Sequence, residues 1–388
     1  MFNILTLNKI AAVGTSRLGD NYAYGDDVQN PDAVLVRSAA MHDMQFEDNL
    51  LAIARAGAGT NNIPKDVCSE KGIVVFNTPG ANANAVKELV IAGLLLSSRR
   101  VMEGADWAKT LKGNGDAVGK MVEKGKSQFV GPEIKGKTLG VIGLGAIGIL
   151  VANCAVALGM DVIGFDPFMS VTNALKLNPA VKLMKSGEDL MVNCDYLTIH
   201  VPLTADTRDM VDADMIAKMK DGVRILNFSR DGLVNSTAVL EAVKSGKVAK
   251  YVTDFATDDI IGEENIICLP HLGASTPESE DNCAIMACDE LKEYLENGNI
   301  VNSVNYPACD AGVCATEGRI AVAHKNVHSM LSQFTTLFAN DGINIENMVN
   351  KSRGDYAYTI FDICNPSTEK LVNELQAIDG VIKVRIVK

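Results

Sequence analysis

A glycine-rich stretch near the middle of the chain constrains the fold more than any other feature of the sequence. Gly143, Gly145 and Gly148 form a G-x-G-x-x-G pattern that follows the apolar run 139–142 and opens a helical stretch rich in Ala and Val. The first glycine allows a tight turn, the second lets the backbone approach a pyrophosphate, and the third lets helix and strand pack closely. This context predicts a doubly wound, dinucleotide-binding domain.

An acidic residue downstream of the glycines indicates which dinucleotide is bound. Asp166 ends the next predicted strand, 161–165, at about the spacing expected for a ribose-binding carboxylate. A carboxylate there accepts hydrogen bonds from the ribose diol and repels a 2′-phosphate. We therefore predict NAD as the cofactor, with its pyrophosphate at the backbone N–H groups of Ala146 and Ile147, where the helix begins.

The hydrophobic pattern predicts more than one domain. A chain of 388 residues exceeds the roughly 250–300 residues at which single cores stop growing. Short apolar runs at 33–36, 50–54 and 73–76 are typical of buried parallel strands, and a second α/β run begins at residue 139. The last 70 or so residues read strand, helix, strand, strand, helix, strand, which is the ferredoxin-like order. The predicted fold class is α/β: two doubly wound, Rossmann-like domains with parallel sheets, followed by a ferredoxin-like βαββαβ domain.

Composition excludes several other classes of protein. The net charge of −12 argues against nucleic-acid or anionic-membrane binding, and no apolar run approaches the roughly 18 residues of a membrane span. The N-terminus lacks the basic and apolar regions of a signal peptide. The nine cysteines contain no C-x-x-C pair, so we expect reduced thiols in the cytoplasm. We predict no metal site.

Two residues that follow predicted strands are candidates for the chemistry. His271 lies between an apolar strand and a long helix, where an imidazole can exchange a proton with a substrate hydroxyl. Arg230 follows a buried-looking strand and has the geometry to bind a carboxylate. Asp258 or Asp259 is the candidate partner of the imidazole. Each of these residues also has a simpler explanation. His271 could cap the next helix, Arg230 could form a structural ion pair, and Asp258 and Asp259 could be solvated surface acids.

These residues, taken in order, resemble one known family. The resemblance covers nearly the whole chain and is carried by Gly143–Gly148, Asp166-Pro167, His200-Val201-Pro202, Asn227-Phe228-Ser229-Arg230 and Pro270-His271-Leu272-Gly273. The chain is similar to the D-isomer-specific 2-hydroxyacid dehydrogenases. The resemblance implies NAD-dependent oxidation of a small D-2-hydroxy acid, with 3-phosphoglycerate as the expected substrate. This reaction would be the first step of serine biosynthesis.

The family mechanism implies roles for residues of both predicted domains. The substrate carboxylate binds Arg230 and backbone N–H groups, and His271 takes the hydroxyl proton while hydride passes to nicotinamide. The remaining expected substrate residues are Arg37, Ser38, Ala56, Gly57, Ala58 and Asn82. The remaining expected cofactor residues are Pro167, His200, Val201, Pro202, Thr207, Asn227, Ser229, Asp254 and Gly273.

The resemblance also implies domain boundaries and a regulatory module. The substrate-binding domain comprises 1–89 and 276–305, the NAD-binding domain 90–275, a linker 306–317 and the C-terminal domain 318–388. The C-terminal domain resembles an ACT domain, in which His324, Asn326 and Asn344 match the positions that bind serine as effector. A homodimer or homotetramer is expected.

Three departures from the family pattern leave other functions open. Asp231 follows Arg230 where the family has glycine, the glutamate that pairs with the histidine is absent, and Lys87 replaces a small residue. One alternative is a reductase of hydroxypyruvate, glyoxylate or another 2-oxo acid. The other is a non-catalytic protein that senses an amino acid.

Overall fold

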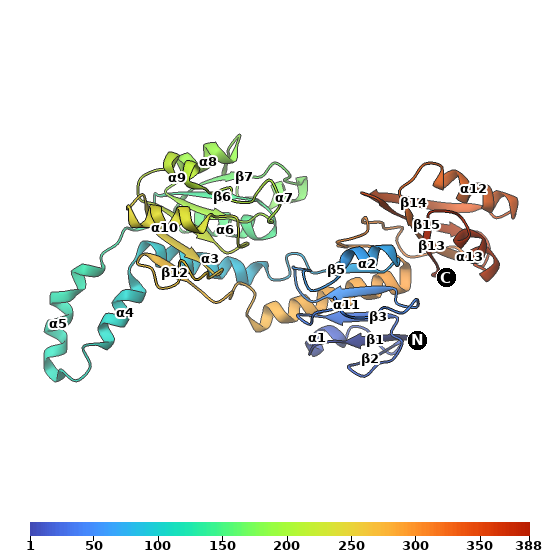
Figure 1. Cartoon of the computed structure of the whole chain (residues 1–388), viewed down its shortest axis with the longest axis horizontal. Helices are drawn as coiled ribbons and strands as arrows, with labels where there is room; N and C mark the ends of the chain where they lie inside the picture. The colour runs from blue at the N-terminus through green and yellow to red at the C-terminus, as the bar shows by residue number, and fades with distance from the viewer. The chain divides into compact units, whose positions relative to one another are not determined.

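The computed structural model describes all 388 residues, which form two compact units (Figure 1). One unit comprises Met1–Asn82 with Pro277–Lys388, and the other is Ala83–Thr276. The chain therefore leaves the first unit once and returns to it through a single long helix.

The Ala83–Thr276 unit is built on a seven-stranded parallel sheet in the order β12-β11-β10-β9-β6-β7-β8. Its strands are β6 (Thr138–Ile142), β7 (Asp161–Phe165), β8 (Lys182–Leu183), β9 (Tyr196–Ile199), β10 (Val223–Asn227), β11 (Val248–Thr253) and β12 (Ile266–Cys268). Its helices are α3 (Ala83–Ser98), α6 (Ala146–Ala157), α7 (Val171–Lys176), α8 (Gly187–Asn193), α9 (Ala213–Lys218) and α10 (Ser236–Lys244). Separate apolar clusters pack α3 and α6 on one side and α8, α9 and α10 on the other. The predicted doubly wound domain is confirmed.

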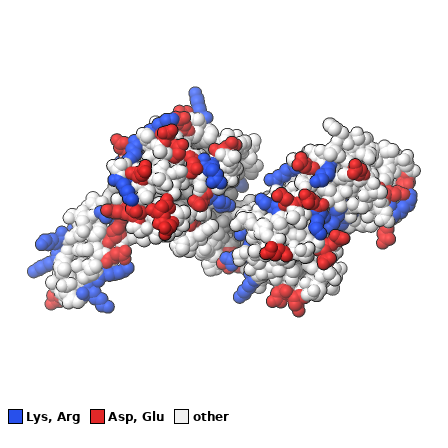
Figure 2. Space-filling view, in the orientation of Figure 1, with Lys and Arg blue, Asp and Glu red and all other residues white.

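A helical hairpin projects from this unit between α3 and β6 (Figure 1). It consists of α4 (Val101–Lys109), η1 (Gly115–Ala117), α5 (Val118–Gly125) and η2 (Lys126–Phe129). The Trp107 and Phe129 rings hold it together with centroids 5.4 Å apart, and basic side chains gather on it (Figure 2). The sequence pattern across 85–111 is helical without a breaking residue, and the structure divides this stretch into two helices, α3 and α4, because the chain turns after Ser98.

The N-terminal part of the other unit carries a five-stranded parallel sheet in the order β2-β1-β3-β4-β5. Its strands are β1 (Phe2–Thr6), β2 (Tyr22–Gly25), β3 (Ala33–Val36), β4 (Ala52–Arg55) and β5 (Val74–Asn77). Its helices are α1 (Ala12–Thr15), α2 (Lys65–Glu70) and α11 (Pro277–Asn297). The strand order reverses between β1 and β3, which makes the carboxyl ends of these two strands a topological switch point.

The C-terminal part of the same unit is a four-stranded antiparallel sheet in the order β14-β15-β13-β16. Its elements are β13 (Gly318–Lys325), α12 (Met330–Asn340), β14 (Ile345–Arg353), β15 (Tyr356–Ile363), α13 (Glu369–Gln376) and β16 (Val381–Ile386). Both helices pack on one face of the sheet around Phe334, Phe338 and Phe361. The ferredoxin-like prediction is confirmed.

The second face of this antiparallel sheet is covered by α11 and the N-terminal sheet. Ala321, Tyr358 and Ile360 belong to the same apolar cluster as Leu291 of α11. The segment expected to be a linker takes part in this core, because Tyr306 and Cys309 are fully buried. No helix combines the length and apolar character needed to cross a membrane.

Candidate active site

The glycine-rich turn between β6 and α6 has the geometry that its sequence predicts. Gly143 has a φ of +88°, and a Cβ there would lie 2.4 Å from the carbonyl oxygen of His200. A Cβ on Gly148 would lie 1.9 Å from the carbonyl oxygen of Gly143, so helix and strand approach as closely as glycine allows. A Cβ on Gly145 would meet nothing within 4 Å. The second glycine therefore leaves the backbone and the start of α6, at Ala146 and Ile147, open to a pyrophosphate.

Asp166 ties this turn to the end of β7. Its Oδ2 accepts a 2.9 Å hydrogen bond from the N–H of Leu144, and its Oδ1 accepts a 2.8 Å bond from the N–H of Phe168. The carboxylate is thereby fixed beside the glycine turn, where a ribose diol would bind in a dinucleotide domain. These residues fit NAD.

His200 follows β9 and is neutral at physiological pH. Burial lowers the pKa of His200 to about 4, and its Nε2 lies 3.0 Å from the Thr198 hydroxyl. A neutral imidazole suits the wall of a cofactor site better than a proton-transfer role. Thr207 donates a 2.7 Å hydrogen bond to the carbonyl oxygen of Pro202, and Ser229 donates a 2.9 Å bond to that of Val201. Two side-chain hydrogen bonds therefore hold the loop after β9 in this conformation.

His271 and Asp254 form one corner at the carboxyl ends of β11 and β12. The N–H of His271 donates to the carbonyl oxygens of Asp254 and Leu269, each at 3.1 Å. Asp254 is only 3% exposed; its Oδ2 accepts a 3.2 Å bond from the N–H of Gly273, and its Oδ1 has no hydrogen-bond partner. Burial raises the pKa of Asp254, and the electrostatic attraction of His271 opposes this rise. Asp254 is therefore the buried carboxylate whose charge the neighbouring His271 favours.

Neither of the two expected partners, Asp258 and Asp259, makes a hydrogen bond to the imidazole, and their pairing with it stays a prediction. Asp259 accepts a hydrogen bond of 2.5 Å from the Thr257 hydroxyl, and this bond lowers the pKa of Asp259. Asp258 is exposed. Sequence reasoning placed Asp254 only in the cofactor wall, because its pattern match to the family assigns the acid to a later position.

Arg230 lies on a loop that the side chain of Asn227 holds by hydrogen bonds. Asn227 donates a 2.9 Å hydrogen bond to the carbonyl oxygen of Arg230 and accepts a 3.2 Å bond from the N–H of Ser229. The guanidinium is exposed and contributes to the electrostatics of Asp254. The neighbouring Asp231 carboxylate accepts the N–H of Gly232 at 2.9 Å, a bond within its own turn. Arg230 therefore retains a side chain able to bind an anion.

The expected substrate residues of the other unit follow its parallel strands. Arg37 and Ser38 come directly after β3, at the switch point. In the turn after β4, the N–H of Ala56 already donates to Val36 and that of Gly57 to Arg55. The Ala58 carbonyl oxygen accepts a 2.6 Å bond from Asn77, and Asn82 lies just before α3. Sequence reasoning missed Asn77, which follows β5 and could have been found as a polar residue at a strand end.

The three expected effector residues lie in the ferredoxin-like domain with differing exposure. His324 is 2% exposed, and its Nδ1 and Nε2 lie 2.8 Å from the Lys325 carbonyl oxygen and 2.9 Å from the Thr359 hydroxyl. Asn326 and Asn344 are exposed. The histidine is therefore a satisfied core residue in this structure, and the structure does not bring the three side chains together by any hydrogen bond.

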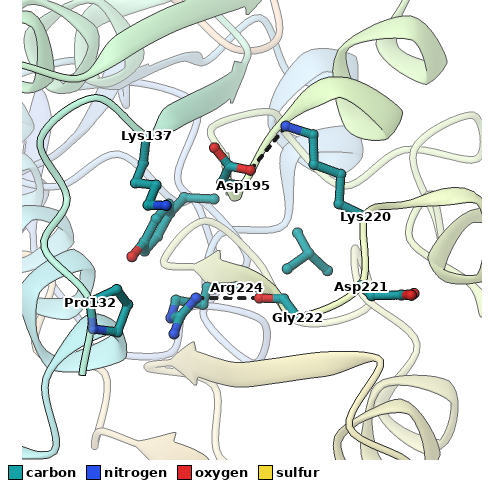
Figure 3. Close-up of a pocket in the computed structure, with 9 residues that line it drawn as sticks. Pro132, Lys137, Asp195, Lys220, Asp221, Gly222 and Arg224 are labelled. Carbon is teal, nitrogen blue, oxygen red and sulfur yellow. Dashed lines mark hydrogen bonds and ion pairs between the residues drawn. The ribbon is translucent and has the colours of Figure 1, made fainter. Parts of the chain in front are cut away.

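A separate pocket opens at the side of the seven-stranded sheet where the strands begin, opposite the glycine turn (Figure 3). It lies at the amino ends of β6, β9 and β10, whereas the glycine turn follows the carboxyl end of β6. Four of its charged groups have partners: Lys220 donates to Asp195 at 2.9 Å, Arg224 to the Gly222 carbonyl oxygen at 3.3 Å, and Lys247 to Asp221 at 2.7 Å. This pocket is distinct from the candidate active site. No group of three or more His, Cys, Asp or Glu side chains is placed to hold a metal ion.

Comparison with known proteins decides the family. Residues 91–273 match the family described as "D-isomer specific 2-hydroxyacid dehydrogenase, NAD binding domain". A "Putative D-3-phosphoglycerate dehydrogenase" of Schizosaccharomyces pombe is 31% identical over 377 residues, covering 88% of this chain and 75% of that protein. The chain belongs to the D-isomer specific 2-hydroxyacid dehydrogenases. The predicted family and NAD as its cofactor are thereby confirmed.

Other proteins with related names are similar to this chain in sequence or in fold. "D-3-phosphoglycerate dehydrogenase" of Mycobacterium leprae is 34% identical, covering 81% of this chain and 60% of that protein. The NAD⁺-bound 3-phosphoglycerate dehydrogenase of Entamoeba histolytica superposes with a TM-score of 0.59 at 25% identity, covering 78% of this chain and 98% of that one. A glyoxylate reductase structure, at 24% identity and a TM-score of 0.63, covers 78% of this chain and 98% of that one and shares the fold.

Proposed function

We propose that this dehydrogenase oxidises D-3-phosphoglycerate to 3-phosphohydroxypyruvate. The observation that carries the proposal is that Arg230, Asp254 and His271 each follow the carboxyl end of a strand (β10, β11 and β12) in the sheet that bears the glycine turn. NAD, held by the glycine turn and Asp166, would supply a nicotinamide as the acceptor for the hydride from C2 of the substrate. His271 accepts the hydroxyl proton, and the neighbouring negative charge of Asp254 stabilises the imidazolium that forms.

The choice of a phosphorylated substrate rests on the other unit. Arg37 and Ser38 follow β3 at the switch point of the 2-1-3-4-5 sheet, where open α/β sheets bind their ligands. A guanidinium beside a hydroxyl matches a phosphate monoester better than a methyl or hydroxymethyl group. The curated relatives named above carry the same substrate in their names. The roles of Arg37, Ser38, Ala56, Gly57, Ala58 and Asn82 remain predictions.

The test is the initial rate of NADH production with 3-phosphoglycerate, measured beside D-glycerate, D-lactate and the reverse reaction with glyoxylate and hydroxypyruvate. Selective turnover of the phosphorylated acid supports the proposal. Faster turnover of an unphosphorylated acid favours the reductase alternative, and NAD binding without turnover of any acid favours the non-catalytic alternative.

Two variants assign the chemistry within that test. His271→Asn removes the base, and asparagine tolerates the positive φ of 49° at this position better than alanine does. We expect loss of turnover with NAD affinity nearly unchanged, whereas an equal loss of NAD affinity would remove His271 from proton transfer. Arg230→Ala should weaken every 2-hydroxy acid alike; unchanged KM and kcat would contradict its role.

We also propose an ACT-type regulatory role for the ferredoxin-like domain, with serine as effector at His324, Asn326 and Asn344. Because both ring nitrogens of His324 already have partners, serine must exchange one of them or use the asparagines. Inhibition by serine that is abolished by Asn326→Ala supports this role. A cytoplasmic location is proposed alongside, supported by nine free cysteines. The homodimer or homotetramer stays a prediction.

A further inference from the structure

Arg37 is held in place by a residue that sequence reasoning missed. The Oδ1 atom of Asn8, which follows β1, accepts hydrogen bonds from three consecutive backbone N–H groups at 2.9, 2.9 and 3.1 Å. The donors are Arg37, Ser38 and Ala39. Three converging N–H groups form a concave anion-binding site, and here a side-chain amide already fills it. An incoming phosphate therefore depends on the side chains of Arg37 and Ser38.

The carbonyl side of Arg37 is fixed as well. The Nε of Arg55 donates a 2.8 Å hydrogen bond to the carbonyl oxygen of Arg37. With both backbone groups engaged, the start of the Arg37 side chain has a defined position at the β1/β3 switch point. The backbone of Arg37 is therefore fixed, whereas its guanidinium can still exchange one anionic partner for another.

That guanidinium is paired with a carboxylate on α11. The Nη2 of Arg37 lies 2.6 Å from Oε1 of Glu280, and each side chain is 45% exposed. Glu280 lies in the first turn of α11, where the helix dipole stabilises negative charge. The pair is half open to solvent, so the carboxylate can be exchanged for another anion at small cost.

We propose that Glu280 determines how strongly the enzyme selects a phosphorylated substrate, by competing with the substrate phosphate for Arg37. This inference rests on the proposed function, in which Arg37 receives the 3-phosphate. The bound phosphate displaces Glu280 from the guanidinium and meets the repulsion of the nearby carboxylate. Unphosphorylated acids leave the Arg37–Glu280 pair intact.

The experiment is a charge series at residue 280, with KM measured for 3-phosphoglycerate and for unphosphorylated D-glycerate. Glu280→Gln should lower KM for 3-phosphoglycerate roughly three- to fivefold, the size of an exposed ion pair. Glu280→Lys should lower it further, and added salt should reduce the differences. The KM for D-glycerate and both kcat values should stay unchanged.

The chain supplies a matched control on the same helix. Asp289 pairs with Arg17 at the same distance, 2.6 Å, and is also about half exposed. Asp289→Asn removes an equivalent ion pair and should leave both KM values unchanged. An equal fall in KM for both substrates, or the same fall in Asp289→Asn, would overturn the proposal because it would reveal a general effect of charge or of helix stability.

Inorganic phosphate provides a second readout that is independent of the substrate backbone. Phosphate competes for Arg37, so its inhibition constant against 3-phosphoglycerate should fall in Glu280→Gln and Glu280→Lys in the same order as KM. If the wild type turns over 3-phosphoglycerate but the two Glu280 variants have its inhibition constant for phosphate, the role of Glu280 is refuted and the proposed function is not. Absence of wild-type turnover on 3-phosphoglycerate would instead refute the proposed function.

Discussion

The main-chain N–H of His271 donates a 3.1 Å hydrogen bond to the carbonyl oxygen of Asp254. This main-chain bond, with the bond from the Gly273 N–H to the Asp254 carboxylate, places the two residues in one hydrogen-bonded corner. Because family members carry a glutamate later in the chain, and that glutamate is absent here, the corner gives Asp254 the position from which a carboxylate can stabilise a protonated imidazole.

Asp254→Asn should slow the oxidation of the 2-hydroxy acid and move its pH dependence. Removing the negative charge weakens the electrostatic stabilisation of the imidazolium formed in the reaction, so kcat/KM should fall roughly tenfold. The acidic limb of the kcat/KM profile should move to lower pH, because a neighbouring carboxylate favours the protonated form of a base. The measurement is kcat/KM between pH 5 and 9.

Asp259→Asn is the matched control for this prediction. Asp259 is bonded to Thr257 rather than to His271, so its profile should superpose on that of the wild type. A displaced limb in Asp259→Asn with an unchanged one in Asp254→Asn would show that the imidazole uses the later acid, as the sequence pattern predicts.

The strand ends explain why much of the site could be predicted from sequence. The glycine turn, Asp166, Arg230 and His271 each follow a short apolar run, and such runs identify buried parallel strands well. The position of Asp254 relative to His271 could not be predicted, because a match of sequence patterns does not give the direction in which the chain leaves β11. Asn8 was missed because β1 itself was not recognised.

Asp166→Ala should relax the preference for NAD over NADP. The carboxylate repels a 2′-phosphate and also tethers the glycine turn through the N–H of Leu144. We expect the ratio of kcat/KM with NADP to that with NAD to rise about tenfold or more. Asp166→Asn keeps an oxygen for the tether and removes the charge, so it separates the two effects. An unchanged cofactor preference in both variants would show that another residue reads the ribose.

Long-range packing accounts for what the sequence pattern did not predict. The segment 306–317 contains few periodic apolar residues and was expected to be a linker, yet Tyr306 donates a 2.7 Å hydrogen bond to the carbonyl oxygen of Ser69. The stretch 85–111 has a helical pattern that no proline interrupts, but Arg100 has a non-helical ψ of 54°. In both cases contacts between distant residues override the local pattern.

Arg385→Met should loosen the ferredoxin-like domain from α11. The last turn of α11 contains no basic residue, and Nη2 of Arg385 donates to the carbonyl oxygens of Tyr294 and Leu295 in this turn at 2.8 and 2.6 Å. Loss of these charge-assisted bonds should cost about 2 kcal/mol, or roughly 4–8 °C in the melting temperature of a unit of this size. Lys370→Met removes only surface ion pairs and should change the free energy of unfolding by less than about 1 kcal/mol. Equal effects of the two substitutions would contradict the capping role.

Glu290→Gln should change how stability depends on pH. Glu290 is 6% exposed, its Oε1 accepts a 2.6 Å bond from Asn302, and its Oε2 has no hydrogen-bond partner. Burial raises the pKa of Glu290 from 4.5 to about 8. The folded state therefore holds a proton that the unfolded chain releases, so this group's contribution to stability is complete below about pH 4.5 and is lost as the pH rises toward 8.

The free energy of unfolding of the wild type should consequently fall between these pH values by up to about 1.4 kcal/mol per pH unit relative to Glu290→Gln. Glutamine keeps the acceptor for Asn302 without a titrating proton, so the variant should gain stability relative to the wild type as the pH rises. Denaturant unfolding at pH 5, 6.5 and 8 measures this difference. Asp281→Asn, on the exposed side of the same helix, should run parallel to the wild type; a parallel course for Glu290→Gln as well would mean that Glu290 is already ionised in the folded protein.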